Sequence, residues 1–232
     1  MLADEKKMDV DAVLFDLDGT LLDSIGIYYD IVDIVFEKLE LPPVPKERFV
    51  EAAKDGDFEW DCVLPADMKD RKEELVKAAT DLIYEIYPDM FAKKLKIVPG
   101  AEAILKDIYK GGMKIGIVTS TPEEGMSHKR HILRKTGIDK FVEVVITADD
   151  VQYKKPAGEP LVICSQKLGI APEKSVYVGD SRIDIKAGKA AGMKTIGVLT
   201  GFDDRNALGA QEPDAIIQSV VELPEVINFN HS

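Results

Sequence analysis

Short apolar runs rich in β-branched residues alternate with amphipathic segments over most of this chain. The runs cover residues 10–15, 114–119, 142–147, 175–179, 194–199 and, more weakly, 214–217. Nearly continuous apolar runs of this length are typical of strands buried on both faces, as in a parallel sheet. Helical patterns lie between them, at residues 101–109, 124–135, 158–168 and 183–191. This alternation predicts an α/β fold with a doubly wound parallel sheet.

The alternation stops between residues 23 and 97. This stretch contains no clear strand, and its apolar residues recur at helical spacing over residues 28–39 and again over residues 73–87. We therefore expect two domains. One is a core made of residues 1–22 and 98–232, and the other is a helical insert made of residues 23–97.

Four short polar segments lie at or near the ends of the predicted strands. They are Asp16-Leu17-Asp18-Gly19-Thr20, Thr119-Ser120, Lys155-Pro156 and Gly179-Asp180-Ser181-Arg182-Ile183-Asp184. In an open parallel sheet, the carboxyl ends of the strands lie along one edge, and ligands bind at that edge. Groups that are far apart in the sequence are therefore expected to meet in one cleft.

The first segment carries the residue types that phosphoryl transfer needs. A carboxylate at the end of a strand, such as Asp16, can attack phosphorus and form an aspartyl-phosphate. Asp18 is placed to protonate the leaving oxygen and then to activate the hydrolytic water. Gly19 permits a sharp turn, and its amide is expected to face the phosphate. Taken alone, the same residues are equally consistent with a simple turn after a strand.

Two further acids, Asp180 and Asp184, are expected at the same edge. A carboxylate nucleophile and a phosphate repel each other, and a hard divalent cation such as Mg²⁺ removes that repulsion. We expect Asp16 and Asp180 to bind the ion directly, with the backbone carbonyl of Asp18 as a third ligand. Asp184 is expected to bind it directly or through water; the alternative is an acid in the first turn of a helix that complements the helix dipole.

The remaining two segments offer donors and positive charge for a phosphate. The hydroxyls of Thr119 and Ser120 can donate hydrogen bonds to phosphoryl oxygens. Lys155 supplies a positive charge for the phosphate and for the Asp16 carboxylate. Lys154 is a rival for this role, but Pro156 favours Lys155 because the residue before a proline is held extended.

Together these segments resemble the four motifs of the haloacid dehalogenase-like (HAD) hydrolase superfamily. The stretch 178–193 is similar to the phosphoglycolate phosphatase-like branch, and the likeness extends over residues 10–200. The resemblance implies a Rossmann-like core, an aspartyl-phosphate intermediate, bound Mg²⁺ and a mobile helical cap that closes over the substrate. Two positions depart from the family pattern: Ser120 stands where Asn is frequent, and Gly158 replaces the second proline of Lys-Pro-x-Pro.

The leading hypothesis is a Mg²⁺-dependent phosphatase that hydrolyses the phosphate monoester of a small metabolite. A dehalogenase is disfavoured because it has no leaving oxygen for Asp18 to protonate. A sugar-phosphate mutase of the beta-phosphoglucomutase type is the main enzymatic alternative, since it uses the same two aspartates but keeps water away from the phosphoenzyme. The non-enzymatic alternatives are a phosphoryl-accepting receiver domain, which is much shorter and has no helical insert, and a catalytically silent HAD-like scaffold or binding protein.

The net charge, the length of the apolar runs and the spacing of the cysteines indicate which kinds of partner and site are disfavoured. The net charge of −12 argues against a nucleic-acid partner and against electrostatic docking to an anionic membrane. No apolar run approaches the roughly 20 residues of a membrane helix, and residues 1–9 do not resemble a signal peptide. The spacing of Cys62 and Cys164 suits neither a zinc site nor a redox pair. We expect a soluble cytoplasmic protein, monomeric or homodimeric, that binds a small phosphorylated metabolite.

The charge of one loop in the insert bears on the substrate. Residues 52–65 contain four acids and a single cation, namely Asp55, Asp57, Glu59, Asp61 and Lys54. Like charges in a closed, water-poor site are costly, so this loop predicts a preference for phosphate esters whose leaving group is neutral or cationic. The alternative is that the acids face solvent and that Lys54 or Arg182 binds an anionic group.

Overall fold

The computed structural model describes residues 7–53 and 58–229, apart from the side chain of residue 69, and the chain forms two compact units. The larger unit takes in the residues up to Asp23 together with those from Ile97 onward, and the smaller unit spans Ser24–Lys96. Strands β2 (Leu22–Asp23) and β3 (Lys96–Ile97) pair in a two-stranded sheet where the chain passes between the units.

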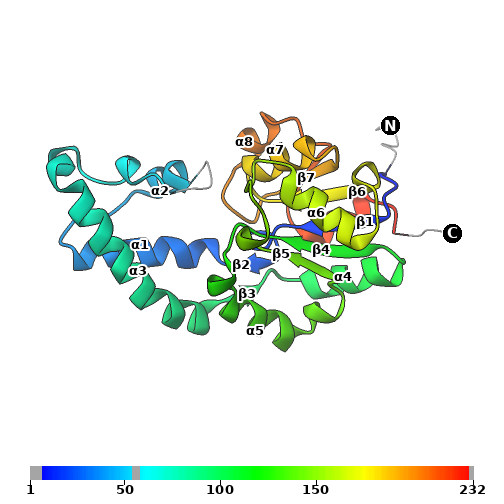
Figure 1. Ribbon diagram of the computed structural model, residues 1–232, viewed down its shortest axis with the longest axis horizontal. Coiled ribbons are helices and arrows are strands. Elements are labelled where there is room, and N and C mark those ends of the chain that lie inside the picture. The colour runs from blue at the N-terminus through cyan, green and yellow to red at the C-terminus, as the bar shows by residue number, and fades with distance from the viewer. Residues whose placement is uncertain (1–6, 54–57, 230–232) are drawn as a thin grey trace. The chain divides into compact units, whose positions relative to one another are not determined.

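Six parallel strands form the sheet of the larger unit, in the order β5-β4-β1-β6-β7-β8 (Figure 1). Their bounds are β1 Ala12–Phe15, β4 Lys114–Val118, β5 Val144–Ile146, β6 Ser175–Gly179, β7 Lys194–Val198 and β8 Ala215–Ile217. Each strand lies within one of the predicted apolar runs, which confirms the predicted parallel α/β fold. Phe15 pairs with Ile117 of β4 and with Val178 of β6, so the residues that follow these three strands leave the sheet at one edge.

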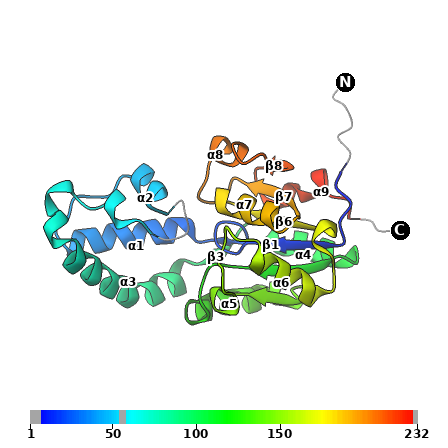
Figure 2. The same ribbon diagram turned by 45° about the horizontal axis from the view of Figure 1, so that its top comes forward.

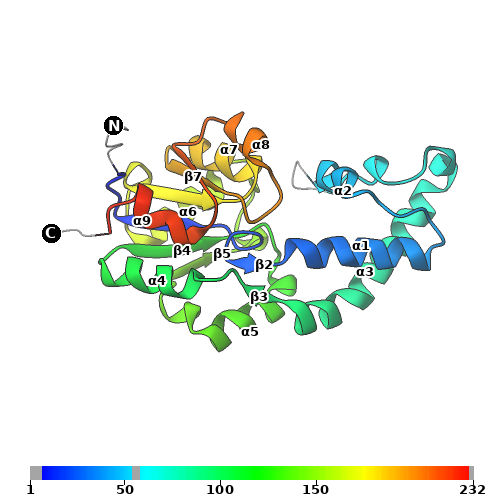
Figure 3. The same cartoon turned by 180° about the vertical axis from the view of Figure 1, so that it is seen from behind.

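Helices cover both faces of this sheet, which explains why its strands are apolar on both sides. Helices α6 (Glu159–Leu168) and α7 (Arg182–Ala190) lie on the face turned to the viewer in Figure 1, and α4 (Ala101–Lys110) and α9 (Leu223–Val226) lie on the face seen in Figure 3. Gly116 allows α6 to approach closely, because a Cβ at this position would lie 2.5 Å from Cys164 Sγ. The remaining elements of this unit are helices α5 (Met126–Thr136) and α8 (Arg205–Gly209) and the 3₁₀ turns Glu123–Gly125, Ile138–Lys140, Ala148–Asp150, Pro172–Lys174 and Val220–Glu222.

The smaller unit is helical, as its sequence pattern predicts. It contains α1 (Ile25–Lys38), α2 (Lys46–Ala53), α3 (Lys72–Lys94) and the 3₁₀ segments Trp60–Cys62 and Ala66–Arg71. Helices α1 and α3 pack side by side (Figure 2). The ring of Phe91 lies 5.1 Å from that of Tyr28 on α1 and stacks at 4.1 Å on Tyr87, its neighbour on α3. These aromatic contacts join the two helices.

Two features of the smaller unit differ from the sequence-based expectation. The helical pattern ended at residue 87, before Pro88, but α3 continues through this proline to Lys94. A proline inside a helix removes one backbone hydrogen bond, and the packing of Phe91 beyond it offsets that loss. Helix α2 was not predicted, because only Phe49 and Ala52 of its residues are buried and two positions make a weak pattern. No helix in the described part of the chain is long and apolar enough to cross a membrane.

Candidate active site

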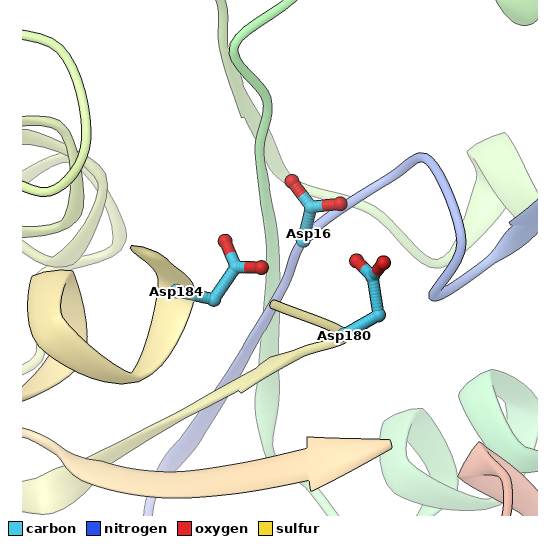
Figure 4. Close-up of side chains that lie close together, drawn as sticks. All are labelled: Asp16, Asp180 and Asp184. Carbon is cyan, nitrogen blue, oxygen red and sulfur yellow. The ribbon is translucent and has the colours of Figure 1, made fainter. Parts of the chain in front are cut away.

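Three of the predicted site residues meet at the carboxyl edge of the sheet. Asp16 follows β1, Asp180 follows β6 and Asp184 lies in the first turn of α7, and each has at most 6% of its surface exposed. Figure 4 shows their carboxylates gathered around a common point. One oxygen from each of the three lies within 4.8 Å of the other two. The fold thus brings together, in one buried cluster, three carboxylates that are up to 168 positions apart in the sequence.

Lys155 joins this cluster. Its ammonium donates to Asp16 Oδ1 at 2.6 Å and to Asp184 Oδ1 at 2.7 Å. It also donates to the Tyr177 hydroxyl at 3.0 Å. Lys155 is buried whereas Lys154 is exposed. The structure therefore brings Lys155 to the carboxylates and leaves Lys154 in solvent.

If all three carboxylates were ionised, the cluster would carry more negative than positive charge. Burial raises the pKa of Asp16 to about 7, and Lys155 only partly opposes this while Asp184 and Asp18 add to it. Burial, together with the charges of Asp184 and Asp16, also holds the pKa of Asp180 well above its usual range. Burial by itself would lower the pKa of Lys155, but the Asp16 and Asp184 carboxylates outweigh it and raise that pKa. A single ammonium therefore does not balance three buried carboxylates.

These residues fit a divalent cation. All three offer the carboxylate oxygens that Mg²⁺ prefers, and a doubly charged ion would supply the positive charge that the cluster lacks. One ion could bind all three, because one oxygen of each carboxylate lies within 4.8 Å of the other two.

Asp180 is held in place by its neighbours. Its Oδ1 accepts a hydrogen bond from Thr20 Oγ1 at 3.3 Å, and its Oδ2 accepts one from the Phe202 amide at 2.7 Å. Gly19 has φ +77°, and a Cβ at this position would lie 2.5 Å from Asp180 Oδ2. A side chain at position 19 would therefore be strained and would also collide with Asp180.

The Gly19 amide, which is expected to face the phosphate, has a backbone partner in this structure. It donates to the Leu22 carbonyl at 2.8 Å, within the turn that follows β1. Its role as a phosphate donor stays a prediction. The geometry also gives Gly19 a conformational role, which is to let the turn pass close to Asp180.

The two carboxylate oxygens of Asp184 have different partners. Its Oδ2 accepts from the Ser181 amide at 3.1 Å and from Ser181 Oγ at 2.6 Å. The Asp184 amide in turn donates to Ser181 Oγ at 3.4 Å, and this reciprocal pair of backbone–side-chain bonds is a capping box at the start of α7. Its Oδ1 accepts from Lys155 and, at 3.2 Å, from the Tyr177 hydroxyl. One oxygen thus caps the helix while the other faces the cluster.

Asp18 lies in a second set of contacts beside this cluster. Its Oδ2 accepts from Lys129 Nζ at 2.5 Å and from Thr121 Oγ1 at 3.1 Å. The Thr121 amide in turn donates to Thr119 Oγ1 at 3.1 Å. Thr119 is buried, whereas the neighbouring Ser120 is exposed. The segment after β4 therefore meets the first motif through Thr121, a residue that was not among the predicted site residues.

Two further residues were missed, and each left a signal in the sequence. Tyr177 lies between two valines in the middle of β6, and its hydroxyl lies 3.1 Å from the Val118 carbonyl as well as beside Lys155. Lys129 lies between Met126 and Leu133 in the row of α5 residues that face inward. A polar residue at a position that the pattern marks as buried is the signal in both cases.

The acidic loop of the smaller unit is only partly described. Lys54, Asp55 and Asp57 lie outside the described residues, and of the remaining acids Asp61 forms an ion pair with Lys72. Arg182, the alternative anion-binding residue, forms a two-pronged ion pair with Asp203, with Nη2 2.6 Å from Oδ1 and Nε 3.0 Å from Oδ2.

Comparisons with known proteins agree with the resemblance seen in the sequence. A phosphoglycolate phosphatase of Salmonella paratyphi A is 34% identical over 168 residues, which cover 72% of this chain and 66%, just under two thirds, of the relative. A protein of Lactobacillus delbrueckii subsp. bulgaricus, described as a phosphoglycolate phosphatase, has a similar structure with a TM-score of 0.78 at 21% identity over 95% of this chain and 99% of its own. A protein of Thermotoga maritima, described as a beta-phosphoglucomutase, has a TM-score of 0.68 at 27% identity over 92% of this chain and 96% of its own.

The family model of haloacid dehalogenase-like hydrolases matches residues 13–198. That range contains every predicted site residue, from Asp16 to Asp184. The relatives named phosphoglycolate phosphatase also confirm the resemblance to that branch. The chain belongs to the haloacid dehalogenase-like hydrolase family.

Proposed function

We propose that this protein is a Mg²⁺-dependent phosphatase that hydrolyses a small-molecule phosphate monoester through a phosphoryl group carried on Asp16. The observation that carries the proposal is the cluster of Asp16, Asp180 and Asp184 with its single lysine. Family membership and the phosphatase relatives support it. We further propose that the protein is soluble and cytoplasmic. That it is a monomer or a homodimer stays a prediction.

The proposed Mg²⁺ ligands are the carboxylates of Asp16 and Asp180 and the backbone carbonyl of Asp18. Asp184 already accepts hydrogen bonds on both oxygens, from Lys155 and from the amide and hydroxyl of Ser181, and the Tyr177 hydroxyl lies 3.2 Å from Oδ1. A carboxylate offers about four lone-pair sites, so few are left. Asp184 is therefore better suited to hold the ion through water. When bound, Mg²⁺ would offset the charge of the nucleophile and of the phosphoryl oxygens.

Asp16 is the proposed nucleophile. Its carboxylate oxygen attacks phosphorus, the bond from phosphorus to the leaving oxygen breaks, and the phosphoryl group is transferred to the aspartate. Lys155 holds Asp16 Oδ1 and so presents the carboxylate in one orientation. The proposed donors to the phosphoryl oxygens are the hydroxyls of Thr119 and Ser120, and positive charge comes from Lys155.

Asp18 is the proposed general acid and base. It gives a proton to the departing alkoxide in the first step, and it takes a proton from the water that attacks the aspartyl-phosphate in the second. The second step returns Asp16 to its free carboxylate and releases inorganic phosphate. Asp18 is suited to this shuttle because its side chain is 15% exposed, in contrast to the nearly dry carboxylates of the cluster.

Replacing Asp18 by asparagine is expected to lower kcat by roughly two to four orders of magnitude, the usual range for loss of a general acid–base group. The amide cannot donate the proton that an alkyl leaving group needs, so the loss should be smaller for aryl phosphates. The measurement is kcat for an alkyl and for an aryl phosphate in the wild-type and Asp18→Asn proteins. An equal loss on both substrates would argue against Asp18 as the acid.

A sugar-phosphate mutase is the second candidate, favoured by one observation. The Thermotoga maritima protein, described as a beta-phosphoglucomutase, is 27% identical to this chain, more than the Lactobacillus protein at 21% but less than the Salmonella phosphatase at 34%. A mutase would return the phosphoryl group to a sugar instead of to water. Product analysis after incubation with a sugar phosphate separates the two: free inorganic phosphate supports the phosphatase, and an isomerised sugar phosphate supports the mutase.

The leaving group of the substrate is the subject of a further prediction. The acids of the loop at residues 52–65 predict a higher kcat/KM for a neutral sugar or alcohol phosphate than for phosphoglycolate. The relatives are named phosphoglycolate phosphatase, and this name favours the opposite preference, for phosphoglycolate. Measurement of kcat/KM for both kinds of ester decides between them, and a clear preference for phosphoglycolate would overturn the prediction drawn from the loop.

A further inference from the structure

Lys129 is a lysine buried inside the larger unit, where a charged side chain requires a specific reason. Helix α5 is polar over most of its length, with the sequence MSHKRHILRKT. Its buried residues are Met126, Lys129 and Leu133, which follow one another at helical spacing. Lys129 therefore occupies a core position, and none of its surface is exposed. A buried ammonium is costly unless it is paired and hydrogen-bonded.

The partners of Lys129 come from the catalytic edge of the sheet. Its ammonium lies 2.5 Å from Asp18 Oδ2 and 2.6 Å from Thr121 Oγ1. The Thr121 hydroxyl also lies 3.1 Å from Asp18 Oδ2, so the three groups close a triangle. Asp18 follows β1, Thr121 follows β4 and Lys129 belongs to α5. One ammonium thus ties together three segments that are separate in the sequence.

The two members of the Lys129–Asp18 pair differ in exposure to solvent. The Lys129 side chain is fully buried, while that of Asp18 is 15% exposed. Asp18 is therefore the member of the pair that solvent can reach, and Lys129 is not. A buried lysine in this place can hold the carboxylate of Asp18 without itself reaching the substrate.

We propose that Lys129 is a positioning residue for Asp18: together with Thr121 it holds the carboxylate in the orientation in which it exchanges protons with the leaving oxygen and with water. This inference rests on the proposed phosphatase function. It assigns Lys129 no contact with the phosphoryl group, and its effect on turnover passes through Asp18. Loss of the ammonium leaves Asp18 able to rotate away from the reacting atoms, and small errors in the placement of a catalytic group are costly to rate.

A double-mutant cycle with Asp18 tests this proposal directly. The variants are Lys129→Met, Asp18→Asn and the double variant, and the matched control is Lys135→Met, which changes an exposed lysine on the same helix. Steady-state kcat and KM are measured with Mg²⁺ on β-glycerol phosphate and p-nitrophenyl phosphate, and thermal unfolding verifies that each variant is folded.

The expected result is that Lys129→Met lowers kcat by roughly tenfold to a hundredfold and leaves KM nearly unchanged, because the loss is confined to part of the acid–base contribution. In the Asp18→Asn background, the same change should alter kcat by less than about twofold, since the residue through which it acts is already gone. Lys135→Met should behave like the wild-type protein.

Three outcomes would overturn the proposal: an unchanged kcat in Lys129→Met, a loss confined to KM, or an equal loss in the two backgrounds. If Lys129→Met does not fold, Thr121→Val decides, because it removes one side of the triangle and keeps the ammonium. A kcat loss that vanishes in the Asp18→Asn background supports the proposal, and an equal loss in both backgrounds refutes it. Absence of turnover in the wild-type protein with Mg²⁺ would refute the phosphatase function itself, and the positioning role with it.

Discussion

Replacement of Asp16 by asparagine is expected to abolish phosphatase turnover in a protein that stays folded. The amide is nearly isosteric with the carboxylate but cannot act as the nucleophile, so the covalent route is closed. Removal of a covalent nucleophile costs on the order of 10⁴-fold or more in kcat. The fold should persist because Lys155 keeps Asp184 as an ionic partner and because one of three crowded buried carboxylates is removed. The measurements are kcat with Mg²⁺ and the midpoint of thermal unfolding.

A matched control for this change is Asp11→Asn. Asp11 directly precedes β1 and is exposed, so it receives the same chemical change on the same strand segment without touching the cluster. We expect Asp11→Asn to keep the activity of the wild-type protein. Full activity in a folded Asp16→Asn protein would contradict the proposed mechanism.

Removal of Mg²⁺ is expected to have the second large effect, a fall of turnover to background while the fold survives. Three buried carboxylates beside one lysine lack positive charge, and without the cation the nucleophile and the phosphate repel each other. Asp180→Ala should have a similar effect, either raising the Mg²⁺ concentration needed for activity or abolishing activity. The measurements are initial rates against Mg²⁺ concentration, with and without chelator, and titration calorimetry of Mg²⁺ binding to both proteins.

Asp139→Ala is the control for Asp180→Ala. Asp139 is exposed and belongs to the 3₁₀ turn Ile138–Lys140, far from the cluster in the sequence. It should leave the Mg²⁺ dependence unchanged. Activity that persists in chelator, or Mg²⁺ binding that is equal in the wild-type and Asp180→Ala proteins, would rule out the proposed metal role.

The sheet could be predicted from the sequence because burial on both faces leaves a simple trace. A strand such as Ser175–Gly179 has no solvent-facing side, so its residues form a short, nearly continuous apolar run. The smaller unit was harder to predict in detail. Helix α3 passes through Pro88 because the aromatic packing of Phe91 lies beyond it, and such a contact between distant residues has no local signature.

The positions of the site residues followed from the fold, and so did the pairing of Lys155 with Asp16, but the other hydrogen-bond partners did not. Once parallel strands are predicted, Asp16 and Asp180 must leave the sheet at one edge. The use of the Gly19 amide by Leu22 depends on the geometry of one turn, which the sequence does not specify. The pairing of Lys129 with Asp18 depends on how α5 packs against the sheet, and any single lysine in a sequence is more often in solvent.

The most direct test of the central claim is to look for the phosphoryl group on the nucleophile. The wild-type protein is mixed with substrate and Mg²⁺, quenched in acid during turnover, digested and examined by peptide mass spectrometry. The account predicts a phosphoryl group on the peptide that contains Asp16, located at Asp16 itself, and no such group in the Asp16→Asn protein. Rapid turnover with no phosphorylated peptide, or with the phosphoryl group on another residue, would contradict it.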